Sequence, residues 1–185
     1  MKSLFAAIFF AFITINLSAQ TEQEKPAYPV SEITKLITYT DVVQVDGKTK
    51  TQLYDKAMKW FHDYFPNPTD VIREQSKEKA KIEGKARFKI YTPEDKKTGK
   101  ADMGAVQYTI TFEAREGRYK VELTEFNWKQ LSYYPIEKWM DKQDAAYKPN
   151  YDHYLLQTDE YAKQVIADLE KAMKTEPPVD NRDKW

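Results

Sequence analysis

The chain has 185 residues, of which 41% are hydrophobic, 31% charged and 14% aromatic, a length and composition that suit one domain with its own core. Its 29 basic and 29 acidic residues balance, so no net charge directs it to nucleic acid or to anionic lipid. It has no cysteine, two histidines and five glycines, which excludes disulfides, thiolate catalysis and cysteine-ligated metal and leaves no glycine loop for a phosphate.

The first residues have the pattern of an export signal. Lys2 precedes an apolar run of about 14 residues, shorter than the roughly 20 that a membrane-spanning helix needs, and Ser18-Ala19 follow as small residues. We therefore expect residues 1–19 to be a cleavable signal peptide, and the mature chain to be periplasmic or secreted with no stable membrane insertion. A lipoprotein would need a cysteine at this position, and an uncleaved membrane anchor is the alternative.

A strand and a helix are predicted after a polar leader. Residues 20–36 include a polar stretch, 21–29, that carries two prolines, and they are predicted to be a disordered leader. Residues 37–45 are rich in Ile, Val, Thr and Tyr, which favours a strand. Thr49 and Gln52 have capping-box spacing, and the helix that they start ends before Pro66. Its apolar stripe consists of Leu53, Ala57, Trp60, Phe61 and Tyr64.

Four more strands are predicted, at residues 71–76, 80–91, 104–115 and 118–128. In the last three, apolar and polar residues alternate, as in an antiparallel sheet with one face in water. Glu116-Gly117 is a two-residue hairpin link. The alternation breaks near Phe126, where we expect a bulge or the end of the strand.

A long aromatic segment and a second helix complete the chain. Residues 129–157 are predicted to be an aromatic-rich connection, residues 158–176 a helix capped by Thr158, and residues 177–185 a polar tail. Both helices have one apolar side, which must cover the apolar face of the sheet. The prediction is an α+β, two-layer domain in the order β-α-β-β-β-β-α, with its core at residues 37–128.

Several short segments resemble a known family. They are Val45-Asp46-Gly47-Lys48, Leu53-Tyr54-Asp55-Lys56-Ala57, Trp60-Phe61, Asp70-Val71-Ile72, Ile82-Glu83-Gly84-Lys85-Ala86 and Gly117-Arg118-Tyr119-Lys120. Together they resemble a domain-of-unknown-function family with a TATA-binding-protein-like (TBP-like) fold, found in secreted proteins of Gram-negative bacteria. The resemblance covers residues 37–128. It implies a curved antiparallel sheet backed by helices and implies no activity.

No residue pattern predicts catalysis, a metal or a cofactor. His62 and Asp63 are neighbours on a helix and so point about 100° apart. His153 has Asp152 beside it but no further ligands at metal-site spacing. No serine lies in a nucleophile-elbow motif. We therefore predict no catalytic residues, no metal site, no cofactor and no enzymatic activity; a small hydrolase with an unrecognised site is the alternative.

Two features are candidates for binding. The first is the charged face of one strand: Lys81, Glu83, Lys85, Arg87 and Lys89. It is either a solvated face or a contact for an envelope protein or polymer, and the export signal argues against nucleic acid. The second is an aromatic excess, with eight aromatic residues between Phe126 and Tyr154 where about four are expected from the composition.

The aromatic residues either bind a partner or hold a long connection against the domain. The candidate binding residues are Trp128, Tyr133, Tyr134 and Trp139, and Pro135 restricts Tyr134 to extended conformations. The sequence thus predicts an exported, non-catalytic binding or interaction module whose partner is an unknown envelope protein or polymer. An envelope structural or accessory protein that docks to a larger assembly is the alternative.

Overall fold

A computed structural model describes residues 28–130 and 132–175 of the chain. The predicted signal peptide at residues 1–19 and the predicted tail at residues 177–185 lie outside the described residues, and so does the first part of the predicted leader. Among the described residues, no helix has both the length and the hydropathy to cross a membrane.

The elements confirm the predicted order and add three short ones. The strands are β1 (Tyr39–Gln44), β2 (Ile72–Ser76), β3 (Lys81–Tyr91), β4 (Asp102–Arg115), β5 (Arg118–Lys129) and β6 (Tyr133–Pro135). The helices are α1 (Lys50–Tyr64), α2 (Pro68–Val71), the 3₁₀ helix η1 (Ile136–Met140) and α3 (Asn150–Lys174). The sequence did not predict α2, β6 and η1, because each is too short to show a period.

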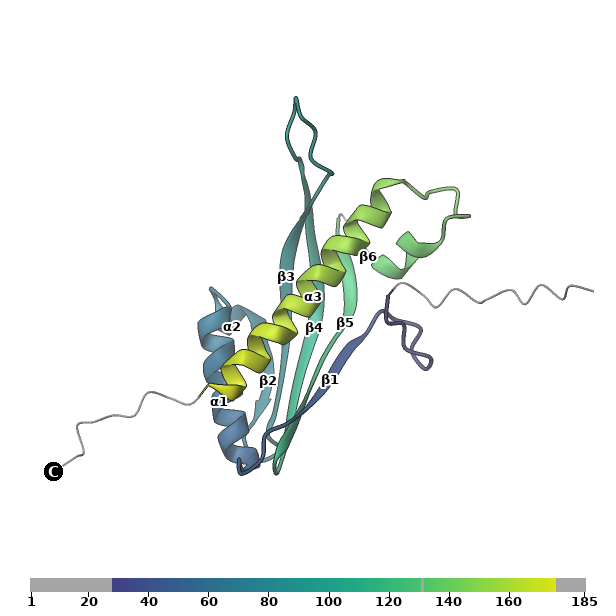
Figure 1. The fold of residues 1–185 in the computed structure, drawn as a ribbon. Helices are drawn as coiled ribbons and strands as arrows, with labels where there is room; N and C mark the ends of the chain where they lie inside the picture. The colour runs from purple at the N-terminus through teal and green to yellow at the C-terminus, as the bar shows by residue number, and fades with distance from the viewer. Residues whose placement is uncertain (1–27, 131, 176–185) are drawn as a thin grey trace, which may run out of the picture.

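The strands form one antiparallel sheet in the order β1-β5-β4-β3-β2, and β6 pairs with the end of β5. Helices α1 and α3 cross the same face of this sheet, with α3 running diagonally over it (Figure 1). The opposite face, which we call the open face, carries the polar residues of the alternating strands. The two-layer α+β architecture is therefore confirmed.

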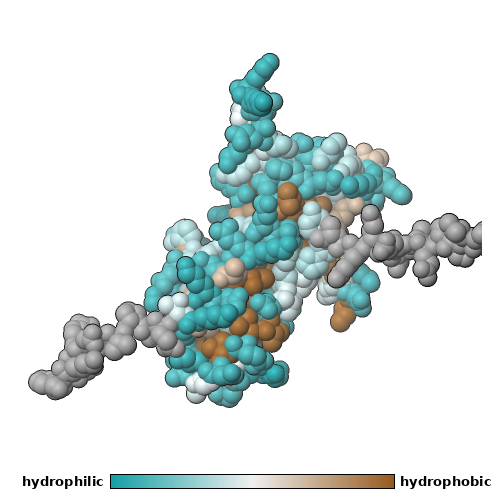
Figure 2. All heavy atoms as spheres, in the orientation of Figure 1, coloured by the Kyte–Doolittle hydropathy of each residue, from teal (hydrophilic) through white to brown (hydrophobic). Residues whose placement is uncertain are grey.

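The core lies between the sheet and the two helices, where the predicted stripes meet. Trp60 on α1 is 4% exposed, and Leu53, Ala57 and Phe61 of the same stripe are fully buried. The capping box is present as predicted, since Thr49 accepts a hydrogen bond from Gln52 N and Gln52 accepts one from Thr49 N. Apolar side chains show between the polar outer surfaces of the helices, whereas the β3–β4 hairpin tip is hydrophilic (Figure 2).

A β-bulge lies where the alternation of β5 breaks. Gln107 pairs with Asn127 but Thr109 pairs with Thr124, so β5 has one extra residue there. Glu125, within this bulge, has a left-handed φ of 54°. The bulge reverses which residues face the helices: before it Thr124 is on the open face, and after it Phe126 and Trp128 are buried.

Three predicted boundaries are wrong. The part of the leader at residues 28–36 is ordered, because Tyr28 and Val30 pack against the core and Val30 pairs with Ile37 around a turn. The last helix starts at Asn150 rather than at Thr158. Thr158 is buried inside the helix and donates to Tyr154 O, so it is not a cap. The predicted connection at residues 129–157 therefore contains β6, η1 and the first two turns of α3.

Candidate functional site

Two of the four predicted binding residues are buried in an aromatic cluster. Trp139 is completely buried and Trp128 is 9% exposed. Trp139 stacks on Tyr151 with ring centroids 5.6 Å apart and meets Trp128 edge-on at 5.6 Å. Tyr154 contacts both tryptophans. Trp139 therefore offers no surface to a partner and Trp128 offers very little, so these two residues fit a packing role better than the binding role expected of them.

This aromatic cluster holds the connection against the domain, which is the alternative that the sequence left open. It joins the end of β5, η1 and the first turns of α3. The Trp128 indole N–H donates to Met103 O at 2.8 Å and so also fixes the start of β4. Buried aromatic pairs of this kind stabilise a fold by about 0.5–1.5 kcal/mol beyond the area that they bury.

The other two predicted residues lie on β6 and differ in exposure. Tyr134 is half-buried, meets Trp128 edge-on at 6.5 Å and has Lys138 Nζ 5.2 Å from its ring centroid. Tyr133 is 58% exposed. Of the four predicted residues, Tyr133 is thus the one whose ring is available to a partner.

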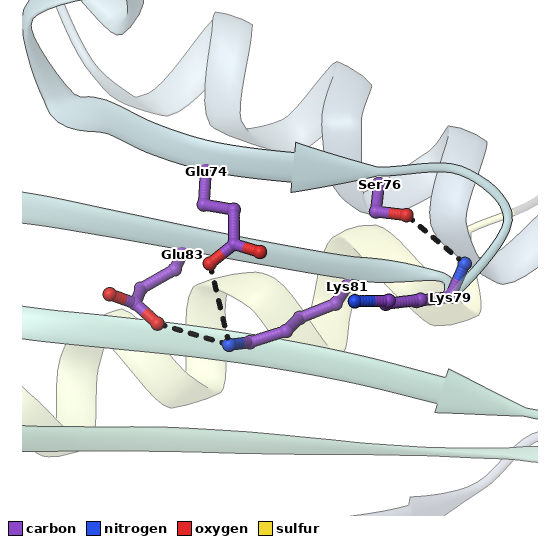
Figure 3. A network of polar contacts seen from close by, with 5 residues as sticks. All are labelled: Glu74, Ser76, Lys79, Lys81 and Glu83. Carbon is purple, nitrogen blue, oxygen red and sulfur yellow. Dashed lines mark hydrogen bonds and ion pairs between the residues drawn. The ribbon is translucent and has the colours of Figure 1, made fainter.

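Part of the open face is neutralised by pairing. Lys81 Nζ lies 3.1 Å from a Glu83 carboxylate oxygen and 3.8 Å from one of Glu74, across the β2–β3 ladder (Figure 3). Lys120 and Glu122 form a similar pair at 3.5 Å on β5. Pairs as exposed as these contribute at most about 1 kcal/mol each. They make this part of the predicted charged strand face a solvated, balanced surface.

A groove of about 520 Å³ crosses the rest of the open face, from α2 to β6. We call it the cationic groove, because Arg73, Lys85, Arg87 and Lys129 line it together with the single acidic residue Asp70. The Lys85 ammonium group lies 3.9 Å from a carboxylate oxygen of Glu125, a residue that is not part of the groove lining. Arg73, Arg87 and Lys129 are exposed and form no ion pair with any other described residue. Tyr133 and Gln107 complete its polar wall.

The bulge at Glu125 is what brings Lys129 to this groove. Because β5 has one extra residue, Asn127 and Lys129 take the open face that Thr124 occupies before the bulge. The Glu125 carboxylate accepts a hydrogen bond from Thr109 Oγ1 at 2.7 Å, which anchors the bulge. The sequence indicated Arg87 through its strand alternation, but nothing in the sequence placed Arg73 and Lys129 beside it.

The strongest electrostatic perturbations lie away from the groove, in the core. Tyr39 donates to the Asp159 carboxylate at 3.0 Å, and burial together with this carboxylate raises the pKa of Tyr39 well above its usual range. Asp159 also accepts from Lys163 at 2.7 Å. Burial, followed by the neighbouring Tyr161, likewise raises the pKa of Tyr108. These tyrosines are protonated hydrogen-bonding groups that tie α3 to the sheet.

The histidines lie on different helices and away from the groove. His62 is exposed on α1, and His153 is half-buried on α3. Within the part of the chain that the structure describes, no group of three or more histidine and acidic side chains is close enough to hold a metal ion. The groove therefore offers cationic and hydrogen-bonding side chains, the exposed ring of Tyr133 and the largely buried ring of Phe65.

The sheet topology and the helices on one face define a two-layer α+β domain of the TBP-like class. Residues 39–129 match the family described as a domain of unknown function (DUF4468) with TBP-like fold, so the domain formed by these residues belongs to this family. This confirms the resemblance seen in the sequence.

Solved structures show the same fold. A DUF4468 family protein from Bacteroides ovatus is 20% identical with a TM-score of 0.62, over 80% of this chain and 91% of that one. A TBP-like protein from Parabacteroides distasonis is 14% identical with a TM-score of 0.59, over 77% and 95% of the two chains. At these identities the likeness establishes the fold alone. No curated protein matches the chain.

Proposed function

We propose that the protein is an exported, non-catalytic interaction module that holds an anionic partner in the cationic groove. The observation that carries this proposal is the gathering of Arg73, Arg87 and Lys129, which are without acidic partners among the described residues, around one exposed tyrosine ring. The groove replaces the tryptophans as the candidate binding surface.

The distribution of charge on the open face supports this choice. Outside the groove, the ammonium groups of Lys81 and Lys120 each lie within 4 Å of a glutamate carboxylate, so these two charges are already neutralised. The cationic groove has an excess of positive charge in a concave surface, and such surfaces raise the local concentration of anions and speed their association. Guanidinium groups pair with carboxylates through two parallel hydrogen bonds, which gives Arg73 and Arg87 a specific chemistry.

The residues that line the cationic groove also support a non-catalytic role. General acid–base catalysis needs a titratable group near its working pH within hydrogen-bond reach of the substrate. Arginine and lysine stay protonated near neutral pH, and both histidines of the chain lie outside the groove. Asp70 is the single carboxylate in the lining, so the groove has no pair of acidic groups to share a proton transfer. Export rests on the pattern of residues 1–19, and it directs the search for a partner to the envelope.

The test compares two double charge reversals in the full-length protein produced in its native host. Arg73→Glu with Arg87→Glu reverses the groove, whereas Arg115→Glu with Arg118→Glu makes the same charge change at the far end of the open face. All four arginines are exposed, so both variants should melt near wild type.

A photo-crosslinking residue at position 133, introduced into each variant, then captures the envelope partner. We expect the groove variant to lose at least about nine-tenths of the crosslink, since two charge-assisted pairs are replaced by repulsions. The control variant should keep it. Equal crosslinking in both variants would show that the cationic groove is not the binding site.

A further inference from the structure

Strand β3 has an outer edge that β2 leaves uncovered beside the cationic groove. In the described part of the sheet, β2 pairs with β3 only from Lys81 to Gly84, and β3 continues to Tyr91. At the far end, the side-chain amide of Gln157 on α3 accepts from Tyr91 N at 3.0 Å and donates to Tyr91 O at 2.9 Å. Gln157 thus acts like a single residue of a neighbouring strand.

The backbone groups of Arg87 and Lys89 point outward at this edge. Ala80 O accepts a hydrogen bond from Ala114 N, so the even-numbered residue Ala80 directs its carbonyl toward β4. Backbone groups of successive residues in a strand point in opposite directions. The odd-numbered residues therefore direct theirs away from β4, as Tyr91 does toward Gln157. No described strand pairs with Arg87 or Lys89 on that side.

The side chains along this edge differ between the two faces of the sheet. On the open face, Arg87 and Lys89 stand in one row, with Arg73 of β2 nearby in the groove. Lys89 also pairs with Asp102 at 2.7 Å. On the helix face, the half-buried ring of Phe88 stacks on Tyr161 with centroids 4.0 Å apart. An added strand would thus meet cations on one face and an aromatic ring on the other.

We propose that the occupant of the cationic groove is an extended segment of a partner protein that adds to the sheet as a strand beside Arg87–Lys89, in line with β2. Its residues alternate between acidic side chains, which meet Arg87 and Arg73, and apolar side chains, which cover Phe88. This inference rests on the proposed function and names the partner's chemistry. The stretch from Lys85 to Lys89 admits roughly five residues at about 3.3 Å each.

A peptide fits this edge better than an anionic polysaccharide does. Strand addition uses main-chain N–H donors and C=O acceptors that recur every second residue, and a polysaccharide lacks this pattern. The opposite edge of the sheet is less suited. On β1, Asp41 pairs with the buried Val121 and so stands on the helix face. An inward-pointing charge of this kind discourages strand addition.

The test uses a synthetic nine-residue peptide of alternating glutamate and valine, with the full-length protein. Two derivatives carry N-methyl groups on alternate amides, one on the set facing β3 and the other on the opposite set. We expect methylation of one set to weaken binding at least about tenfold and methylation of the other set to leave the affinity unchanged. Amide hydrogen exchange at Arg87 and Lys89 should slow when the unmethylated peptide binds.

Substitutions at Lys89 give a second, matched comparison. Lys89→Pro removes the outward N–H, and Lys89→Ala removes the charge but keeps the N–H. We expect the proline variant to bind the peptide at least about tenfold more weakly than the alanine variant. Should the proline variant melt well below wild type, the methylated peptides decide the matter by themselves.

The outcomes separate this inference from the proposed function. Equal binding of both methylated peptides, or no change in exchange at Arg87 and Lys89, would overturn strand addition while leaving the groove as the binding site. Binding of polygalacturonate but not of the glutamate–valine peptide would overturn the peptide partner and also leave the groove. If the peptide binds the double variant Arg73→Glu, Arg87→Glu as well as wild type, the proposed function fails.

Discussion

Replacing Trp139 by alanine tests whether the aromatic residues after β5 stabilise the domain or bind a partner. The ring is completely buried and contacts Trp128, Tyr151 and Tyr154 at centroid distances of 5.6–5.7 Å. Truncation of a buried tryptophan costs about 3–5 kcal/mol. For a domain of this size, 1 kcal/mol shifts the melting temperature by about 2–4 °C, so Trp139→Ala should lower it by roughly 6–20 °C.

The conservative variant Trp139→Phe separates the effect of ring packing from that of the indole N–H. The Trp139 indole N–H is buried and has no hydrogen-bond partner among the described residues. Trp139→Phe keeps the stacking on Tyr151 and removes this unpaired donor, which offsets part of the lost contact area. We expect it to cost about 1–2 kcal/mol, well below the alanine variant. Tyr133→Ala, at a residue that is 58% exposed, should cost less than about 0.5 kcal/mol.

The assay is thermal unfolding followed by far-UV circular dichroism, with near-UV dichroism to report the aromatic cluster. Hydrogen exchange in the first turns of α3 should rise in Trp139→Ala before it rises elsewhere, because the cluster joins that end of α3 to β5. If Trp139→Ala melts within about 2 °C of wild type, the ring does not hold the connection and the packing described here is wrong.

Three other predictions follow from the core. Trp60→Ala should destabilise the domain by about 3–5 kcal/mol in chemical denaturation, because the ring is 4% exposed and its N–H bonds Asp168 at 2.7 Å. Gly84→Ala should lower the free energy of unfolding by about 1–3 kcal/mol, because the added Cβ would lie 3.1 Å from a Val71 methyl carbon and 3.3 Å from Val71 O. A melting temperature at or above wild type would contradict this packing. The pKa of Tyr39 is raised in the folded protein, so the stability that this hydroxyl contributes is complete below the usual tyrosine pKa near 10 and is lost as the pH rises above that value. Tyr39→Phe should therefore flatten the fall in melting temperature at alkaline pH.

The sequence by itself determined the secondary structure that depends on short-range periodicity. Alternation over β3, β4 and β5 and the stripe of α1 are local patterns, and Thr49 with Gln52 caps α1 through bonds within four residues. The same patterns predicted two layers, because each apolar face needs another to cover it. The start of α3 was missed because its first apolar positions, Tyr151 and Tyr154, belong to the aromatic excess and read as part of the connection.

Only the tertiary structure decided which residues form the candidate site. Arg73, Arg87 and Lys129 come from β2, β3 and β5, and sheet order rather than sequence distance brings them together. The sequence signalled a break near Phe126 but not its consequence. One extra residue at Glu125 buries Trp128 and turns Lys129 to the open face, because a shift of one residue exchanges the two faces of a strand. The free edge of β3 has a similar origin, since it exists only because β2 is shorter than its neighbour.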